Sequence, residues 1–216
     1  MGGLTGPAAP PAGPIEPNMP PCINRETGYT AVELMFTTAL MVILSGIAVP
    51  QMLASVEETR TVGAVRYLAA RLQRLRSEAV RRSAVVSMRF ASDASGWQFT
   101  EYLDGNGNGV LAADIQRGVD RPLAPADRLT NSFRGVDVGV LPGVPSVDAG
   151  SPPPDGDPLK LGASNAVSFA PQGSASSGSI YVLGRAGSQY VIRVFGETGK
   201  TRILRYDAAL RRWMPL

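Results

Sequence analysis

The feature that most constrains this chain is a stretch of 23 residues, 34–56, that contains no charged side chain. As an α-helix rising about 1.5 Å per residue, this stretch would be about 35 Å long. That length matches the hydrocarbon core of a bilayer, which is about 30 Å thick. The sequence therefore predicts that residues 29–56 form a helix that spans a membrane.

Beyond residue 56 the apolar residues recur at alternating steps of three and four positions. This spacing places them along one side of a helix, with several arginines off the stripe. We expect an amphipathic helix over residues 57–83, because such a stripe has to be covered, here by a β-rich head. The stripe consists of Val65, Leu68, Leu72, Leu75 and Ala79, and the arginines are Arg66, Arg71, Arg74 and Arg81.

Residues 84–216 predict the β-rich head. Apolar residues alternate there with polar ones over short segments that are separated by glycine, asparagine and proline, which is typical of antiparallel strands. Residues 142–158, rich in proline and glycine, predict an exposed irregular loop. The six predicted strands are residues 84–90, 97–103, 166–170, 179–183, 189–195 and 201–206.

Composition argues against an enzyme. The chain has no histidine, the usual general base and the commonest metal ligand, and its single cysteine is Cys22. We therefore expect no catalytic residues, no metal site, no cofactor and no small-molecule substrate. Arginine far outnumbers lysine, which is present only as Lys160 and Lys200, and arginine is suited to bidentate contacts with carboxylates or phosphates.

The start of the apolar stretch differs from an ordinary secretory signal. Such a signal is cleaved after its apolar run, whereas here a small residue, Gly28, precedes the run and Glu33 lies inside its start. A carboxylate in a membrane helix costs about 2 to 3 kcal/mol near the centre and less near the interface. We therefore expect a partner for Glu33. Residues 1–27, rich in glycine, proline and alanine, predict a disordered segment.

Gly28, Tyr29, Thr30, Glu33 and Leu34 occur in the order of the processing motif of the type IV prepilins, which this region resembles. The resemblance implies that residues 1–28 are a cytoplasmic leader and that a prepilin peptidase cuts between Gly28 and Tyr29. Tyr29 would then become the N-methylated first residue. It also implies a single pass through the bacterial inner membrane, with the head in the periplasm.

Glu33 and Pro50 are the residues we assign to assembly. Cleavage would create an α-amine at Tyr29, and Glu33 of a neighbouring subunit could neutralise it where water is scarce and the helices pack in register. Pro50 falls where pilins commonly carry a helix-bending proline, and together with Gly46 it weakens the helix hydrogen bonds. Insertion into the membrane and assembly into a fibre should thus depend on different residues.

The head resembles the GspH/FimT family of minor pseudopilins. Three segments carry the resemblance: WQFTEYLDGNGNGVLAADIQRGVDRPL, then VSFAPQGSASSGSIYVL, then GKTRILRYD. The family fold implies an α+β protein, in which a long N-terminal helix packs on a head of two small antiparallel β-sheets. The resemblance extends from Gly28 to about Asp207.

The loop after the second predicted strand has a second interpretation. Asp104, Asn106, Asn108 and Gly109 match the opening of a calcium loop, in which oxygen ligands alternate and glycine makes the turn. The twelfth position, where a bidentate acid is required, is Ile115. We therefore favour a turn-forming loop over a calcium site.

Cationic and aromatic residues gather near the C-terminus, and Gly199, Lys200 and Arg202 match a Gly-basic-x-basic segment of FimT-like proteins tied to DNA uptake. A basic strand can hold a phosphate backbone, although most such runs are solvent-exposed edges. Lys200, Arg202 and Arg205 are the candidate DNA-binding residues. The others are Arg193, Arg211, Arg212, Tyr206 and Trp213.

These observations predict a minor pilin or pseudopilin, a structural subunit of a type II secretion pseudopilus or a type IV pilus. Its partners would be prepilin peptidase, other pilins or pseudopilins, and the inner membrane. One alternative is a DNA-binding minor pilin of a transformation pilus. Another is a membrane-anchored periplasmic domain that never polymerises.

Overall fold

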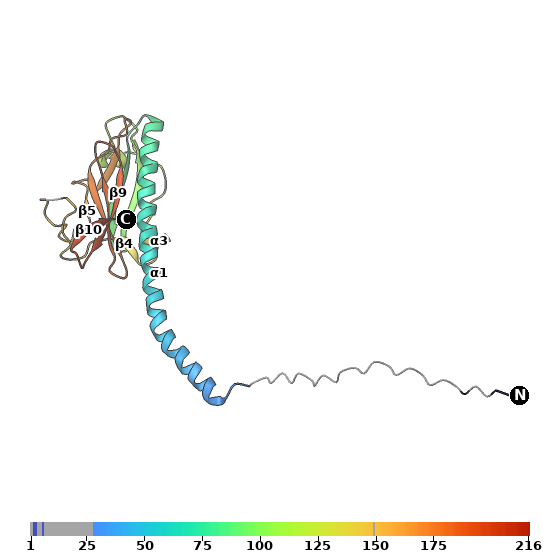
Figure 1. Cartoon of the computed structure of the whole chain (residues 1–216). Coiled ribbons are helices and arrows are strands. Elements are labelled where there is room, and N and C mark those ends of the chain that lie inside the picture. The colour runs from blue at the N-terminus through green and yellow to red at the C-terminus, as the bar shows by residue number, and fades with distance from the viewer. Residues whose placement is uncertain (1, 4–5, 7–27, 149) are drawn as a thin grey trace. The chain divides into compact units, whose positions relative to one another are not determined.

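The computed structural model describes residues 2–3, 6, 28–148 and 150–216 (Figure 1). The chain divides into two compact units, residues 1–45 and residues 46–216, which we describe separately. Most of the predicted leader lies outside the described residues, as does Cys22. The division into leader, membrane helix, amphipathic helix and head therefore stays a prediction.

A helix of 52 residues, α1 (Ala31–Arg82), contains both the predicted membrane segment and the predicted amphipathic segment. Within the described part of the chain it is the one helix long and apolar enough to cross a membrane. The helix ends where Ser83 adopts a left-handed φ of 52°. There the N–H groups of Ser83 and Ala84 donate to the carbonyl groups of Val80 and Ala79, which the helix end would otherwise leave free.

Four antiparallel strands form the first sheet, in the spatial order β3-β2-β1-β6. β1 (Val86–Asp93) and β2 (Gly96–Leu103) are consecutive and pair along their full length. β3 (Arg121–Pro122) pairs with β2, and β6 (Ala166–Phe169) pairs with β1. Two short helices, α2 (Ala112–Gln116) and α3 (Leu129–Ser132), lie in the connections that follow β2.

The second sheet has six strands, five of them in the order β10-β9-β8-β7-β4. Its centre is formed by β7 (Gly178–Gly184), β8 (Gln189–Val194) and β9 (Thr201–Asp207). Three shorter strands, β4 (Val136–Val138), β5 (Leu159–Lys160) and β10 (Arg212–Pro215), pair at its margins. All six predicted strands are present, with ends that differ from the prediction by at most three residues.

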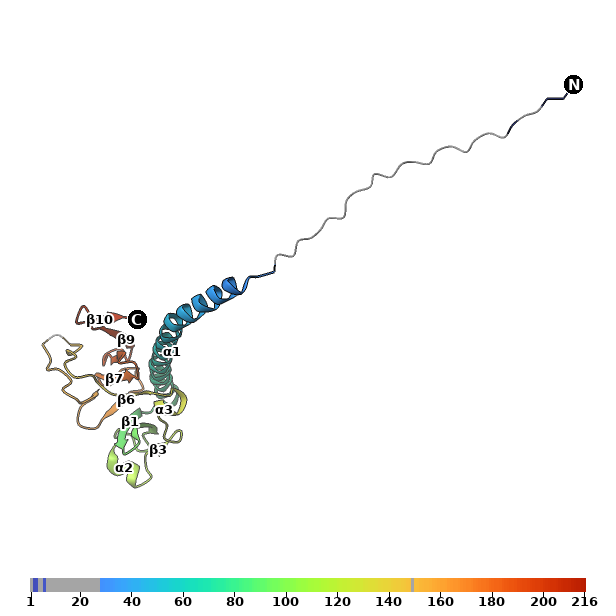
Figure 2. The same cartoon turned by 90° about the horizontal axis from the view of Figure 1, so that it is seen from below.

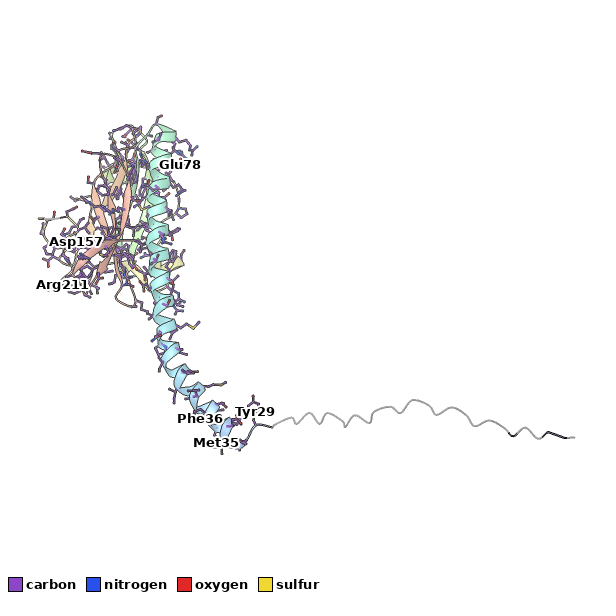
Figure 3. All side chains as sticks on the ribbon, in the orientation of Figure 1. Tyr29, Met35, Phe36, Glu78, Asp157 and Arg211 are labelled. Carbon is purple, nitrogen blue, oxygen red and sulfur yellow. The ribbon has the colours of Figure 1, made fainter. Side chains whose placement is uncertain are left out.

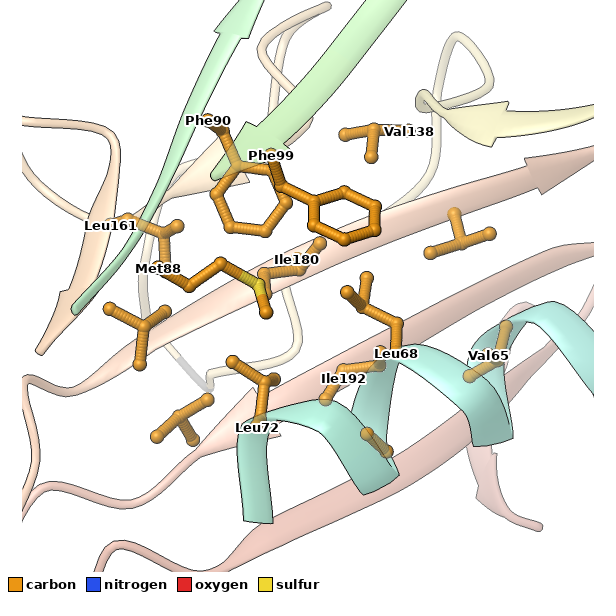
Figure 4. Packing of buried hydrophobic residues seen from close by; sticks show 14 of the residues in the cluster. Val65, Leu68, Leu72, Met88, Phe90, Phe99, Val138, Leu161, Ile180 and Ile192 are labelled. Carbon is orange, nitrogen blue, oxygen red and sulfur yellow. The ribbon is translucent and has the colours of Figure 1, made fainter. Parts of the chain in front are cut away.

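The core lies where α1 meets both sheets, and Figure 2 shows the two sheets beside the same helix. All five residues of the predicted stripe are fully buried. Met88 and Phe99 from the first sheet and Ile180 and Ile192 from the second lie in one cluster with Leu68 and Leu72 (Figure 4). The fold is therefore α+β, a long helix packed on a head of two antiparallel sheets, as predicted.

The loop of residues 142–158 is irregular, as predicted, but the prediction that it is exposed is wrong for several of its residues. Val144 is only 3% exposed. The Trp213 indole N–H donates to the carbonyl oxygen of Pro145 at 3.0 Å, and Arg193 pairs with Asp148 at 3.0 Å. These contacts lie on the face of the second sheet opposite α1, since side chains alternate along a strand. The loop thus covers that face, which the helix leaves open.

Candidate functional site

The predicted processing motif lies at the start of α1. The backbone N–H of Glu33 donates to the Thr30 hydroxyl oxygen at 3.2 Å, and the N–H of Leu34 donates to the Thr30 carbonyl at 3.1 Å. A threonine followed three residues later by a glutamate is a favourable start for a helix. Thr30 therefore ends the non-helical chain, and Gly28 and Tyr29 lie just outside the helix.

Nothing within the described chain requires a glycine at position 28. A Cβ added to Gly28 would meet no atom within 4 Å, and its φ lies outside the left-handed region. The side chain of Tyr29 is 82% exposed. A bulkier residue at position 28 would thus not disturb the fold of this subunit, so any requirement for glycine there has to come from a partner.

The carboxylate of Glu33 has no ion-pair partner among the described residues of its own chain. It lies in the first turn of α1, where the helix dipole favours a negative charge. Around it, Met35 and Phe36 project into open space and are 72% and 69% exposed (Figure 3). The beginning of the helix therefore presents a charge and an apolar surface that its own chain leaves uncovered.

Pro50 lies inside α1, which stays helical around it. Because proline has no N–H, the carbonyl of Gly46 loses the donor that it would normally find four residues on. A Cβ added to Gly46 would meet no atom within 4 Å. The helix therefore lacks one backbone hydrogen bond between Gly46 and Pro50.

A buried ionic network joins α1 to the first sheet. Glu101 of β2 is 1% exposed, and its carboxylate accepts from Arg71 Nε at 2.8 Å and also pairs with Arg74. Arg71 reaches Asp127 at 2.9 Å, and the Tyr67 hydroxyl donates to the same carboxylate at 3.0 Å. This network was missed in the sequence, where Arg71 and Arg74 were only arginines off the stripe, because no local spacing pairs them with Glu101.

Two members of this network have displaced pKa values: the pKa of Arg71 is raised, and that of Asp127 is lowered. Burial acts to raise the pKa of Asp127, but hydrogen bonds from the Arg128 backbone N–H, from Tyr67 and from Asn131, together with the charge of Arg71, lower it below its ordinary value. The carboxylate is therefore ionised in the folded head. It holds Arg71 and Tyr67 against the segment that follows β3.

The Asp104 loop is closed by hydrogen bonds of its own. The Asp104 carboxylate, only 6% exposed, accepts from the N–H groups of Asn106, Gly107 and Gly109 at 2.7–3.0 Å. Asp114 accepts from the side-chain amide of Asn108 at 3.0 Å and pairs with Arg117. These donors occupy the oxygens that a cation would need, and they explain the Asn- and Gly-rich sequence as turn chemistry.

The candidate DNA-binding residues lie on β9 and just before it, but not all on one face. Lys200 and Arg202 are exposed, and neither is in an ion pair within the described part of the chain. Arg205 faces α1, because Ile203 and Thr201 share its side of the strand, and it pairs with Glu58 at 2.9 Å. The structure therefore brings Lys200 and Arg202 together and separates Arg205 from them.

Gly199 has a structural reason to be glycine. Its φ is +61°, and an added Cβ would collide with the carbonyl oxygen of Gly173. Gln73 donates to the Gly199 carbonyl at 3.2 Å, and Arg76 donates to the Gly173 carbonyl at 3.0 Å. The turn before β9 is thus anchored on α1, and this fixes where Lys200 projects.

A hollow of about 630 Å³ lies over the outer face of β2. Gln98, Thr100, Tyr102 and residues 122–126 line it, and none of these side chains is charged. Among the described residues no group of three or more histidine, cysteine, aspartate or glutamate side chains could hold a metal ion.

Comparison with known proteins gives one match. The family model described as type II transport protein GspH matches residues 64–198, which is more than half of the chain. The match begins in the buried half of α1 and ends at the turn before β9. No curated protein and no solved structure matches the chain.

Proposed function

Because the chain belongs to the family of type II transport protein GspH, a family of structural pseudopilins, we propose that it matures by cleavage between Gly28 and Tyr29 and assembles through its N-terminal helix. The family supports a non-enzymatic subunit that contacts other pseudopilins. The apolar helix supports a membrane anchor. We place the helix in the inner membrane and the head in the periplasm.

The observation that carries the cleavage proposal is the contrast between Gly28 and the rest of the motif. Thr30 and Glu33 have a role within the chain, since they begin α1. Gly28 has none, and the peptide bond to Tyr29 lies in exposed, non-helical chain. A peptidase needs an extended and accessible segment with room for its own atoms beside the cut. We infer that prepilin peptidase is the partner that requires Gly28.

The assembly proposal rests on what the helix leaves uncovered. From Tyr29 to Val56 every side chain is exposed, and Glu33 has no partner charge within the described chain. Lipid can cover the apolar side chains but cannot neutralise the carboxylate. An α-amine at Tyr29 of a neighbouring subunit can, and the pairing would be strong because water is scarce there.

Intact-mass analysis of the membrane-extracted protein tests maturation. We expect a chain that begins at Tyr29 and carries one added methyl group. A chain that keeps residues 1–28 would contradict the processing proposal. It would favour the alternative that the protein is a membrane-anchored domain that does not polymerise. A chain cut at Tyr29 without the methyl group would contradict only the N-methylation of Tyr29.

DNA binding by the exposed pair Lys200 and Arg202 is the second candidate function. The favouring observation is that both are exposed without an ion pair, next to a turn that Gly199 anchors on α1. Two residues two positions apart on a strand lie about 7 Å apart, close to the spacing of successive phosphates along one strand.

A salt titration of duplex DNA binding to the detergent-solubilised chain tests this function. With two phosphate contacts, we expect the logarithm of affinity to fall against the logarithm of salt with a slope of about −1.8 from these residues. Lys200→Ala with Arg202→Ala should remove that part of the slope. The control is Arg66→Ala with Arg121→Ala, which removes the same charge at other exposed sites. Equal affinity of the two double variants would argue against DNA binding at β9.

A further inference from the structure

One end of the head lies level with the last turns of the membrane-spanning stretch. A cleft of about 360 Å³ is lined by Ala54 and Glu58 of α1, by Gly187 in the β7–β8 turn, and by Asp207 and Ala208 in the β9–β10 turn. Ala54 belongs to the charge-free stretch that ends at residue 56. Two turns of the head therefore lie beside the helix at the depth where it enters the hydrocarbon.

This end of the head carries four exposed arginines. Arg185 begins the β7–β8 turn, and its side chain lies 3.2 Å from the position of a Cβ on Gly135, so Arg134 is beside it. Arg212 pairs in register with Asp207, and Arg211 precedes it in the turn. Figure 3 shows Arg211 at the opposite end of the head from Glu78. We call Arg134, Arg185, Leu210, Arg211 and Arg212 the basal surface.

The charges of the basal surface are only partly compensated within the described residues. None of its four arginines is in an ion pair there. The nearby acids are engaged: Glu57 pairs with Arg60 at 2.8 Å, and Glu58 pairs with Arg205 at 2.9 Å. Asp207 accepts from the N–H groups of Ala209 and Leu210, which orders the turn. Asp207 keeps its negative charge opposite Arg212, so four arginines against one carboxylate leave the surface positive.

Leu210 adds an apolar contact at the tip of the β9–β10 turn. Its side chain is 55% exposed and stands next to Arg211. An exposed leucine next to arginines suits a shallow insertion into a headgroup layer, because the leucine enters the acyl boundary while the arginines stay at the phosphates.

We propose that the basal surface binds the anionic phospholipid headgroups of the membrane that α1 spans, and so holds the head against the bilayer before assembly. This inference rests on the proposed membrane insertion of α1. Each arginine near an anionic leaflet adds about a fivefold preference for the bound position. A neighbouring copy of the chain could also cover the basal surface. However, Ala54 belongs to the proposed membrane segment and lies at this end of the head, so lipid lies close to the surface even when the subunit is alone.

The test uses the full chain reconstituted at one copy per lipid nanodisc. Cys22 is replaced by serine, and a nitroxide is attached at Ala209→Cys, which leaves Leu210 in place. Its collisional access to oxygen and to a water-soluble nickel chelate is compared in discs of phosphatidylcholine alone and discs with equal amounts of phosphatidylcholine and phosphatidylglycerol. We expect the label to lose access to the chelate only in the anionic discs.

Three variants make the result specific. Arg211→Gln with Arg212→Gln should shift the bound equilibrium back by about 25-fold, whereas Arg211→Lys with Arg212→Lys should not. A label at Val80→Cys, 52% exposed at the far end of α1, should report the same access in both discs.

Equal access at Ala209 in both discs, or loss of access only at several copies per disc, would overturn the proposal, the second result in favour of a neighbouring copy. A label at Met41→Cys separates the two inferences. If Met41 lies in the hydrocarbon while Ala209 stays in water, membrane insertion holds and lipid binding by the head fails. If Met41 also stays in water, the proposed insertion itself is wrong.

Discussion

Replacing Glu101 by glutamine should be the most destabilising single polar change in the head. Glu101 is 1% exposed and accepts from two arginines of α1. The side chain of Arg71 is only 16% exposed, so removing the carboxylate leaves a charge that water cannot reach freely. The side chain of Arg74 is 55% exposed and can turn to solvent.

Breaking a buried ion pair by removing one partner costs about 3 to 5 kcal/mol. Arg71 keeps Asp127 as a second partner at 2.9 Å. We therefore expect Glu101→Gln to lower the free energy of unfolding by about 3 kcal/mol, near the low end of this range. Replacing both groups, Arg71→Met with Glu101→Leu, removes the buried charge together with its partner, while Asp127 keeps its hydrogen bonds from Tyr67, the Arg128 N–H and Asn131 and Arg74 turns to solvent. We therefore expect the double variant to lie within about 1.5 kcal/mol of the parent.

The measurement is urea unfolding of the detergent-solubilised chain, followed by the fluorescence of Trp97 and Trp213. The matched control is Glu78→Gln, which removes a carboxylate paired with two arginines at the exposed end of α1 and should move the midpoint little. A loss below about 1 kcal/mol for Glu101→Gln, or a double variant less stable than the single one, would refute the argument from burial.

Three further predictions concern the processing motif and the ionic network. Gly28→Leu should accumulate uncut precursor on an immunoblot while Gly6→Leu, an equally uncrowded glycine of the predicted leader, matures normally; normal maturation of both would place the cut elsewhere. Glu33→Leu should insert into the membrane at least as well as the parent, because it removes a charge from the apolar segment, but should co-assemble less in a pull-down of fibres. Equal co-assembly would contradict the pairing with the α-amine. Asp127→Asn should be less stable than the parent at neutral pH, and since its folded pKa is lowered, the difference should shrink as the pH falls below about 4, as urea midpoints at several pH values would show; a constant difference would disprove it.

The elements that depend on local periodicity were predictable from the sequence. The long apolar helix, the buried stripe and strands β1, β2, β6, β7, β8 and β9 all follow from the distribution of apolar residues, and a period of 3.6 or 2 is a property of a few consecutive residues. Thr30 and Glu33 also form a motif within one turn of helix. Strands β3, β4 and β5 escaped prediction because two or three residues hold no period, and the four residues of β10, Arg-Trp-Met-Pro, do not alternate polar with apolar side chains.

The tertiary structure decided what depends on pairing between distant segments. Arg71 and Glu101 are 30 residues apart, and nothing in their neighbourhoods relates them until α1 packs on β2. The packing of residues 142–158 could not be predicted either, because a high content of proline and glycine indicates an irregular backbone but does not indicate which residues that backbone contacts.

The C-terminal arginines show most clearly the difference between what the sequence determines and what the tertiary structure decides. In the sequence they form one basic cluster, but the β8–β9–β10 pairing sends Arg202 to one face, turns Arg205 toward Glu58, and carries Arg211 into the β9–β10 turn, at the opposite end of the head from Glu78. A strand alternates its faces at every residue and advances about 3.3 Å each time, so charges adjacent in sequence separate in space. The sequence determined that a basic segment exists, and only the fold decided that it is divided among three surroundings.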